Sequence, residues 1–404
     1  MSHNGWTDKD PSFAAVSKFP SFEYSNKQLK RAGKIIASDL VWTDETAPVI
    51  REAFQIANSW RDAHAYPMRS LRFSVLHHMR KAELKGITAA RLKRMQAIRR
   101  KLRRIKLGLN QLQDLGGCRV ILPSISDVHR LVGLLRENIH HTIRAEDDYI
   151  ANPKDDGYRS HHLIFSYQGK GKTEIYTGKR IELQVRTRLQ HAWATAVEAV
   201  GLFRGEDLKS HSGSEEWLRL FKLLSAEFAE TEVCPVPPDS MDKQERIREI
   251  RELERALDAI SVLENIRHGV RGTDYPLMHG YRPTHYLIRY DHATKTVHVE
   301  PHTGATIAAQ SYGNAEALGN QIDGQSQTVV LVEVDKIENL KAAYPNYFGD
   351  VDYFKNQLRA ITQGQAAVEY AAVPRQPPPK PAGPYGDLSW LRARRFPGPS
   401  LSKK

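Results

Sequence analysis

The stretch that decides the fold runs through residues 147–201: DDYIANPKDDGYRSHHLIFSYQ (147–168), a short Gly/Lys turn, then GKRIELQVRTRLQHAWATAVEAVG (178–201). It holds a basic turn with Lys154, a Tyr158 that follows a glycine, and one acid, Glu182, inside an apolar strand pattern. Lysine binds phosphate, and a tyrosine beside a glycine offers a stacking face for a base. An acid in basic surroundings suits Mg²⁺ ligation or proton transfer. The pattern indicates a nucleotide-handling site.

The composition favours an anionic partner. The 404 residues contain 59 Lys+Arg against 47 Asp+Glu, a formal net charge of +12. Nucleotides, RNA or a membrane surface would suit that charge, although a merely basic protein is as consistent with it. Cys118 and Cys234 are the only cysteines, which argues against disulfides and cysteine-based zinc sites. No apolar run reaches 18 residues and the N-terminus has no signal core, so we expect a cytoplasmic protein without a membrane span.

Hydrophobic spacing predicts an α/β fold in the first 230 residues. We expect helices at 26–40 and 47–64 and a further element at 71–83. The expected α/β part follows: a buried strand at 118–122, a helix at 126–136, hairpin-like strands at 162–167 and 174–185, and helices at 188–200 and 214–230.

Residues 87–106 carry an unusual charge. Nine Lys/Arg lie between Arg91 and Lys106 with no acid, and Leu92, Met95, Ile98 and Leu102 form a narrow apolar stripe. The spacing predicts one helix over 87–106 that packs by its stripe and presents cations. Taken alone, such a run is more typical of a solvated basic face or a generic RNA patch than of a specific site.

Composition also predicts where the units end. Residues 1–24 read as an arm and 25–233 as the main unit, and a Pro-rich break leads into a helical connector at 234–267. Residues 268–365 read as a smaller α/β unit, and 366–404 as a Pro-rich, basic, disordered tail. In the smaller unit we expect strands at 285–290, 296–300 and 328–334 and helices at 314–321 and 336–362.

Two tempting motifs are weak. Gly169–Thr173 is similar to part of a phosphate-binding loop, but the required earlier glycine is Ser166, so a hairpin turn is favoured. The adjacent histidine pairs point to opposite sides of a strand, which argues against metal ligation. Asp114 and Glu182, each at a strand, are either ion-paired structural acids or Mg²⁺ ligands, and their basic surroundings favour the second interpretation.

Five motifs in order resemble the RelA/SpoT synthetase domain, over roughly residues 25–230. They are Arg91-Leu-Lys93 with Ile98 and Lys101; Asp114-Leu-Gly-Gly-Cys-Arg119; Asp148-Tyr-Ile-x-x-Pro-Lys154-x-x-Gly157-Tyr158-Arg159-Ser160-x-His162; Glu182-x-Gln184-x-Arg186-Thr187; and Gln190-His191-Ala-Trp193-Ala194. The helical opening and the segment Trp193–Glu198 resemble the small, synthetase-only branch.

This resemblance implies a mixed-sheet, nucleotidyltransferase-like domain and an ATP-dependent pyrophosphokinase. The family moves the β,γ-pyrophosphate of ATP to a ribose 3′-hydroxyl with Mg²⁺. By resemblance, the ATP phosphates contact Arg91, Lys93, Lys101 and Arg119, and Asp114 and Glu182 hold Mg²⁺ or serve catalysis. The acceptor contacts Lys154, Tyr158, His162, Gln184 and Arg186.

The family's basic motif often has serine where this chain has Ala97, and its acceptor turn often has asparagine where this chain has Asp156. An extra acid near an anionic acceptor argues against free GDP or GTP. Residues 339–354 resemble the C-terminal antitoxin-like region of fused CapRel-type toxin–antitoxin proteins. That resemblance implies pyrophosphorylation of the tRNA 3′ end, masking of the site by Tyr344 and Tyr347, and release by a phage protein.

Three functions therefore stay open at the level of sequence. The first is a tRNA-modifying toxin restrained by its C-terminal unit in anti-phage defence, for which truncation after about residue 265 should raise toxicity. The second is an alarmone synthetase acting on GDP or GTP, in guanosine tetraphosphate metabolism. The third is a catalytically inactive RNA-binding regulator, which would have little use for paired acids in a phosphate site. The sequence does not fix the oligomeric state.

Overall fold

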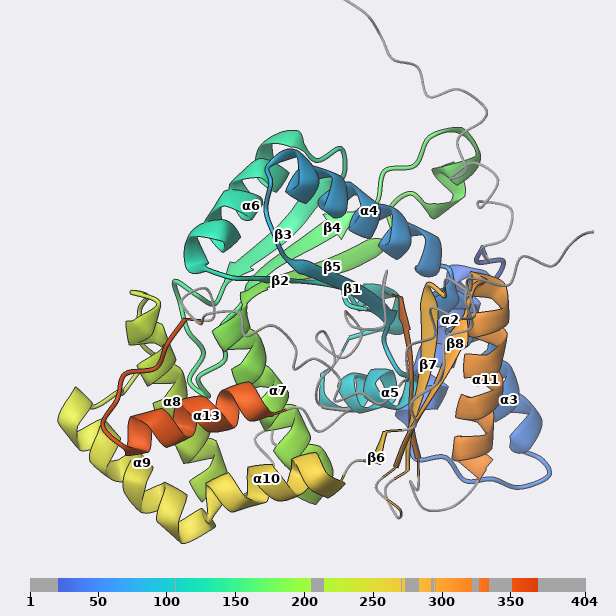
Figure 1. Cartoon of the computed structure of the whole chain (residues 1–404). Helices are drawn as coiled ribbons and strands as arrows, with labels where there is room; N and C mark the ends of the chain where they lie inside the picture. Colours follow the sequence, from blue (N-terminus) through green and yellow to red (C-terminus); the bar gives the residue numbers. More distant parts are fainter. Residues whose placement is uncertain are drawn as a thin grey trace, which may run out of the picture.

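The structure, a computed structural model, describes residues 21–105, 107–204, 214–269, 271–272, 283–291, 294, 296–321, 327–333 and 351–369. Within these ranges the strands form one nine-stranded sheet in the order β3-β4-β5-β2-β1-β9-β7-β8-β6. Parallel and antiparallel pairs both occur, since β2 runs parallel to β5 and antiparallel to β1. The predicted mixed α/β fold is confirmed (Figure 1).

The described strands are β1 (Ile87–Leu92), β2 (Gly116–Leu122), β3 (Thr142–Asp148), β4 (His161–Ser166), β5 (Arg180–Thr187), β6 (Arg271–Gly272), β7 (His285–Asp291), β8 (Thr296–His302) and β9 (Gln327–Glu333). The described helices are α2 (Asn26–Ala37), α3 (Ala47–Asp62), α4 (Ala65–Lys81), α5 (Met95–Arg104), α6 (Ile125–Asn138), α7 (Arg188–Arg204), α8 (Glu215–Thr231), α9 (Lys243–Leu257), α10 (Ala259–Gly269), α11 (Ala305–Gln321) and α13 (Asp352–Thr362).

The register of the central strands brings the motifs together. Gly117 on β2 pairs with Glu182 on β5, and His162 on β4 pairs with Gln184 on β5. Helices α4 and α6 cover one side of these strands, and α7 extends on the other side (Figure 1). Apolar residues of the covered side, such as Leu131 and Leu183, are fully buried. The polar residues of β5 are therefore left to face the side where α7 lies.

The prediction of one helix over 87–106 is wrong. Residues Ile87–Leu92 form β1, and the helix α5 begins only at Met95. Ala89 and Ala90 are buried and β1 pairs with β2 along its whole length, so ladder hydrogen bonds and burial on both faces outweigh the helical spacing. The basic helix is real but shorter, with Met95, Ile98 and Leu102 on its buried face.

Other boundaries differ from the predictions as well. The edge strand β3 was not predicted, because its exposed, charged residues lack an apolar pattern. The predicted strand at 174–185 begins at Arg180, and Gly171–Tyr176 forms a 3₁₀ helix in the connection after β4. The helical connector predicted within 234–267 forms two helices, α9 and α10, which meet at the left-handed Asp258 (φ 46°).

Helix α13 packs far from its neighbours in sequence. Its Phe354 contacts Phe221 and Phe228 of α8, with ring centroids 5.6 and 5.9 Å apart. Phe354, Leu358 and Ile361 are buried in one apolar cluster with residues of α7, α8 and α10. Truncation after residue 265 would therefore remove part of this cluster, so the truncation predicted from the sequence would not isolate an intact first unit.

Strands β7, β8 and β9 extend the sheet beyond β1. Within the described residues, one ladder pair, Ala90 with Glu333, joins β9 to β1. Beneath this junction, Ala89 and Ile121 of the central strands share an apolar cluster with Tyr286, Ile288 and Val332. The predicted domain boundaries stay predictions. The predicted helix before residue 351, Tyr344, Tyr347, the first 20 residues and the tail after 369 lie outside the described residues. Among the helices that are described, none is both long and apolar enough for a membrane crossing.

Candidate active site

A cavity of about 330 Å³ lies between the central strands and α7. Its walls come from the strands β1, β2, β4 and β5, the turn before β4, and the helices α7 and α8. The lining residues are Arg91, Lys93, Asp114, Gly117, Cys118, Arg119, Lys154, Asp156, Tyr158, His162, Glu182, Gln184, Arg186, Trp193, Ala194, Val197, Glu198, Leu218 and Phe221.

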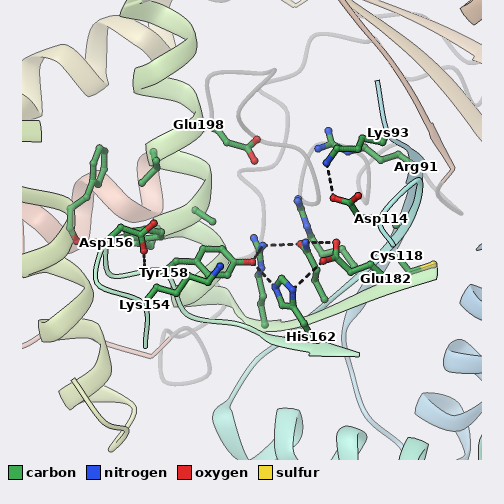
Figure 2. A pocket seen from close by; sticks show the side chains of 18 of the residues that line it. Arg91, Lys93, Asp114, Cys118, Lys154, Asp156, Tyr158, His162, Glu182 and Glu198 are labelled. Carbon is green, nitrogen blue, oxygen red and sulfur yellow. Dashed lines mark hydrogen bonds and ion pairs between the residues drawn. The ribbon is translucent and has the colours of Figure 1, made fainter. Parts of the chain in front are cut away.

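Asp114 stands at one end of the cavity beside Lys93 (Figure 2). Lys101 contacts the same carboxylate. The ammonium nitrogens of Lys93 and Lys101 each lie 2.8 Å from its Oδ2 atom. Burial alone would raise the pKa of Asp114, but the two positive charges lower it below the usual aspartate value. Its other oxygen, Oδ1, is buried and accepts no hydrogen bond within the described part of the chain. A charged oxygen without a donor is a suitable ligand position for a cation.

Glu182 faces the same cavity from β5. Its Oε1 lies 3.1 Å from Nδ1 of His162, and its Oε2 accepts a hydrogen bond from the Gln184 amide at 2.9 Å. Burial would raise the pKa of Glu182, but His162 lowers it below the usual glutamate value through a hydrogen bond and charge, despite the opposing charge of Asp114. Both carboxylates are therefore ionised at neutral pH.

A chain of hydrogen bonds connects Glu182 to Tyr158 (Figure 2). Arg186 donates through Nη2 to the Tyr158 hydroxyl at 2.5 Å, and that hydroxyl lies 2.8 Å from Nε2 of His162. The Tyr158 hydroxyl thus lies between Arg186 and His162, and the His162 ring lies between that hydroxyl and Glu182. These contacts fix the Tyr158 and His162 rings relative to each other.

The turn that carries Tyr158 is held by both backbone and packing. Gly157 has φ +91°, and a Cβ atom there would lie 2.9 Å from Cβ of Ser225. Such a left-handed position favours glycine. Lys154 extends over the rings of Tyr149 and Tyr158, with its ammonium 4.2 and 5.3 Å from the ring centroids. The turn therefore presents an aromatic face and a cation side by side.

A buried carboxylate behind this turn ties it to neighbouring elements. Glu232 has a fully buried side chain at the end of α8, and its Oε2 lies 2.7 Å from Nη1 of Arg159. It also accepts hydrogen bonds from Thr187 at the end of β5 and from Gln190 on α7. Because Arg159 follows Tyr158 directly, Glu232 fixes the turn against β5 and α7.

All but one of the site residues predicted for the first unit line the cavity. The exception, Lys101, contacts Asp114 and so belongs to the same end. The sequence did not single out Glu198, Leu218 or Phe221. Leu218 and Phe221 lie on α8, within the helix predicted at 214–230, and form part of the cavity wall. Glu198 extends from α7 toward the cavity (Figure 2). The sequence feature that could have identified it as a site residue was its position on the inner face of that helix.

The cavity has two chemically different ends. One end combines Arg91, Lys93 and Asp114, and suits polyphosphate with a cation. The other end combines Tyr158 and Lys154, and suits a base with an attached phosphate. Glu182 lies between them as an ionised base. No group of three or more metal-binding side chains occurs in the ranges the structure describes, so a metal held here would need ligands from the substrate.

Comparison with known proteins finds a match over the segment that carries most of the cavity residues. A family model that describes a region found in RelA/SpoT proteins matches residues 90–204. The matched segment begins in β1 and ends with α7, and so contains nearly every predicted site residue. The predicted resemblance to the RelA/SpoT synthetase domain is confirmed for this segment.

Two curated relatives are named GTP pyrophosphokinases. The Escherichia coli K12 protein is 29% identical over 157 residues, which cover 37% of this chain and 20% of the relative. The Bacillus subtilis protein YjbM is 31% identical over 111 residues, which cover 26% of this chain and 51% of the relative. This chain thus spans a fifth to a half of the length of these relatives.

Among solved structures, the small alarmone synthetase 1 from Bacillus subtilis bound to its product pppGpp is similar. It is 20% identical, and the match covers 49% of this chain and 94% of that one at a TM-score of 0.35.

Proposed function

We propose that this protein is an ATP-dependent pyrophosphokinase that transfers the β,γ-pyrophosphate of ATP to a ribose 3′-hydroxyl. The observation that carries the proposal is one cavity with Lys93 and Asp114 at one end, Tyr158 at the other and Glu182 between. In the reaction the 3′-oxygen attacks the β-phosphorus, the bond from that phosphorus to the α,β-bridging oxygen breaks, and AMP leaves. The hydroxyl proton passes to a base.

The donor end would receive ATP. Arg91, Lys93 and Arg119 line this end, and Lys101 reaches it through Asp114. Fixed cations of this kind stabilise the charge that develops on transferred and leaving phosphates. Lys93 and Lys101 are ion-paired with Asp114 in this structure. Bound ATP would therefore compete with Asp114 for the two lysines, and a bound cation would compete with the lysines for Asp114.

Mg²⁺ fits the two carboxylates. Asp114 offers the buried Oδ1 that accepts no hydrogen bond within the described residues, and Glu182 is ionised nearby. Mg²⁺ commonly takes one or two protein carboxylates and completes its shell with phosphates and water. When bound, the ion would supply charge neutralisation for the triphosphate.

The acceptor end would hold the nucleoside. Tyr158 offers its ring to the base, and Lys154, Gln184 and Arg186 would contact its sugar and phosphates. Glu182 would accept the 3′-hydroxyl proton, because it is ionised and is held in place by His162 and Gln184.

For the acceptor we propose the tRNA 3′ end. Outside the cavity, the helices α2 and α5 carry a basic surface of exposed residues, namely Lys30, Lys34, Arg100, Arg103 and Arg104. Such a surface suits a polyanion more than a single nucleotide. Asp156 lines the acceptor end and would repel the phosphates of GDP or GTP. The alternative, alarmone synthesis from GDP or GTP, is favoured by the names of the curated relatives.

On this proposal the protein is a cytoplasmic toxin that blocks translation in anti-phage defence and is restrained by its C-terminal unit until a phage protein relieves it. Tyr344 and Tyr347 would mask the site. The proposal for these two residues rests on the sequence resemblance alone, since both lie outside the described residues.

The test uses the full-length chain with Mg²⁺ and two ATP preparations, labelled at the γ- or the α-phosphate. Bulk tRNA is offered in one reaction and GDP plus GTP in another. Pyrophosphate transfer moves the γ label to the acceptor and leaves the α label in AMP, whereas simple phosphate transfer leaves it in ADP. Tyr347→Ala is assayed in parallel, because a masked site would be inactive in the unmodified chain.

Glu182→Gln is the matched control, since it keeps the shape and removes the base. We expect transfer to fall by roughly 10²–10⁴-fold, as for loss of a general base. Label on guanine nucleotides alone would establish the alternative acceptor. Unmodified and Glu182→Gln chains that arrest growth equally, without any labelled product, would leave an RNA-binding regulator.

A further inference from the structure

The basic helix α5 does not supply its own N-terminal cap. Its N-cap residue is Arg94, no side chain of its own segment caps it, and its first turn has no acid. The helix carries Arg99, Arg100, Lys101, Arg103 and Arg104 within ten residues. The exposed backbone N–H groups at a helix start favour a negative partner, and a short, highly cationic helix depends on one more than most.

The cap comes from the C-terminal part of the chain. Glu316, on α11, accepts the backbone N–H of Met95 through Oε1 at 2.9 Å. The hydroxyl of Tyr312, one turn earlier on α11, donates to the same oxygen at 2.9 Å. Glu316 lies 221 residues after Met95, so this contact joins the two predicted units.

The second oxygen of Glu316 is anchored to α3. Its Oε2 lies 2.9 Å from Nη1 of Arg61, whose side chain is 2% exposed, and the Arg61 guanidinium lies over the Tyr312 ring at 4.9 Å. Burial would lower the pKa of Arg61, but Asp62 and Glu316 hold it above its usual value. The carboxylate is thus fixed by a buried charge, and α11 runs beside α3 (Figure 1).

The capped turn leads directly to the donor end of the cavity. Lys93 lies two residues before Met95 and Lys101 six residues after it, and both hold Oδ2 of Asp114. Glu316 therefore fixes one end of a segment whose other contacts define the position of Asp114.

We propose that Glu316 is a positioning residue for the donor end: the C-terminal unit caps α5 and thereby holds Lys93 and Lys101 in place to bind ATP. The inference rests on the proposed function of that end. It gives the C-terminal unit a supporting role at the donor end, besides any masking of the site.

The test compares Glu316→Gln with Glu333→Gln in the full-length chain. Glu333 lies in the same unit, and its ion pairs run to Arg69 and Arg72 on α4. The readouts are hydrogen exchange of the peptide that covers the start of α5, and binding of Mg²⁺ with a non-hydrolysable ATP analogue by calorimetry. For Glu316→Gln alone we expect faster exchange and an affinity about 3–10-fold lower, in line with the value of a charged helix cap.

Faster exchange with unchanged affinity would reduce the contact to a structural cap and overturn the inference. An equal loss of affinity in both variants would show general loosening and would also overturn it, as would a gain of affinity. If the single variant does not fold because Arg61 is left with one partner, Arg61→Gln/Glu316→Gln removes both buried charges and is measured instead. An unmodified chain that binds no ATP analogue would refute the proposed function and the positioning role with it, and the exchange readout would still report the cap.

Discussion

Tyr158 is the residue whose two parts can be tested separately. Its ring faces the acceptor end, and its hydroxyl links Arg186 to His162. Tyr158→Ala removes a stacking face worth about 1–3 kcal/mol, so we expect the acceptor KM to rise roughly 10–100-fold with the ATP KM unchanged. Tyr158→Phe keeps the ring, so kcat should fall while the acceptor KM stays near its original value. Steady-state kinetics with each substrate varied in turn measures both, and equal kinetics for the two variants would refute the division of roles.

His64 makes stability depend on pH. It is fully enclosed beside Trp60 and Lys179, and burial, followed by the Lys179 charge, lowers its pKa to about 3. The unfolded histidine titrates near 6.5, so the unfolded state binds more protons between these values and stability falls as the pH drops below about 6.5. The linkage relation between protonation and folding predicts that the free energy of unfolding is about 2 kcal/mol lower at pH 5.

Urea unfolding at pH 8 and pH 5 measures this loss. His64→Gln keeps a side-chain donor for the Trp60 carbonyl, which lies 2.8 Å from the His64 ring nitrogen. We expect the variant to be less stable at pH 8 but to lose less on acidification. An identical pH dependence in the two proteins would show that His64 is not the group responsible.

Helix α8 supports the turn that carries Tyr158, the acceptor turn, through Glu232. Removal of one partner from a buried ion pair costs about 3–5 kcal/mol, because the other charge stays buried. For Glu232→Gln we therefore expect a lower melting temperature and a higher acceptor KM, with a smaller effect on ATP. Glu230→Gln is the matched control on the same helix, since Glu230 contacts Lys243 and Arg246 and no residue of the acceptor turn within the described structure. Equal effects of the two variants would contradict the role of Glu232.

The strands show which parts of the structure could be predicted from the sequence. β2 and β5 carry apolar runs interrupted by single polar residues, so their motifs predicted both the strands and the site. β1 was missed because Leu92 and Met95 continue a helical spacing across what is a strand and then a turn. Glu316 had no signal at all, because a cap supplied from 221 residues away leaves no local pattern.

Across the molecule, helices that are neighbours in the sequence can pack against different partners. Two helices of the predicted unit at 268–365 have different packing partners: α13 packs with α7, α8 and α10, while α11 packs with β7 and β9. Hydrophobic spacing reports which face of a helix is buried and not which partner covers it. The site was predictable because its residues lie on adjacent strands, whereas the packing of distant helices was not.

Phe354 tests this arrangement. It is 1% exposed and contacts two aromatic rings of α8. Phe354→Ala should lower the free energy of unfolding by about 3–5 kcal/mol. Phe73→Ala, at a ring that is 47% exposed, should cost much less. Urea unfolding of both variants is the measurement, and similar losses would contradict the buried role of α13.

The place of α13 has a consequence for biosynthesis. The ribosome makes the segment that carries the site by residue 204, but the helix that completes the packing around the acceptor turn ends only at Thr362. At roughly 5–20 residues per second, about 8–30 s separate these two points. Throughout that interval the nascent chain lacks part of its core, and when α13 emerges, α11 and its Glu316 have already been made. We therefore expect stalled nascent chains that end before residue 350 to show no transfer activity, whereas activity in such chains would refute this order of assembly. A chain made in this way never completes its core before its C-terminal unit has been synthesised.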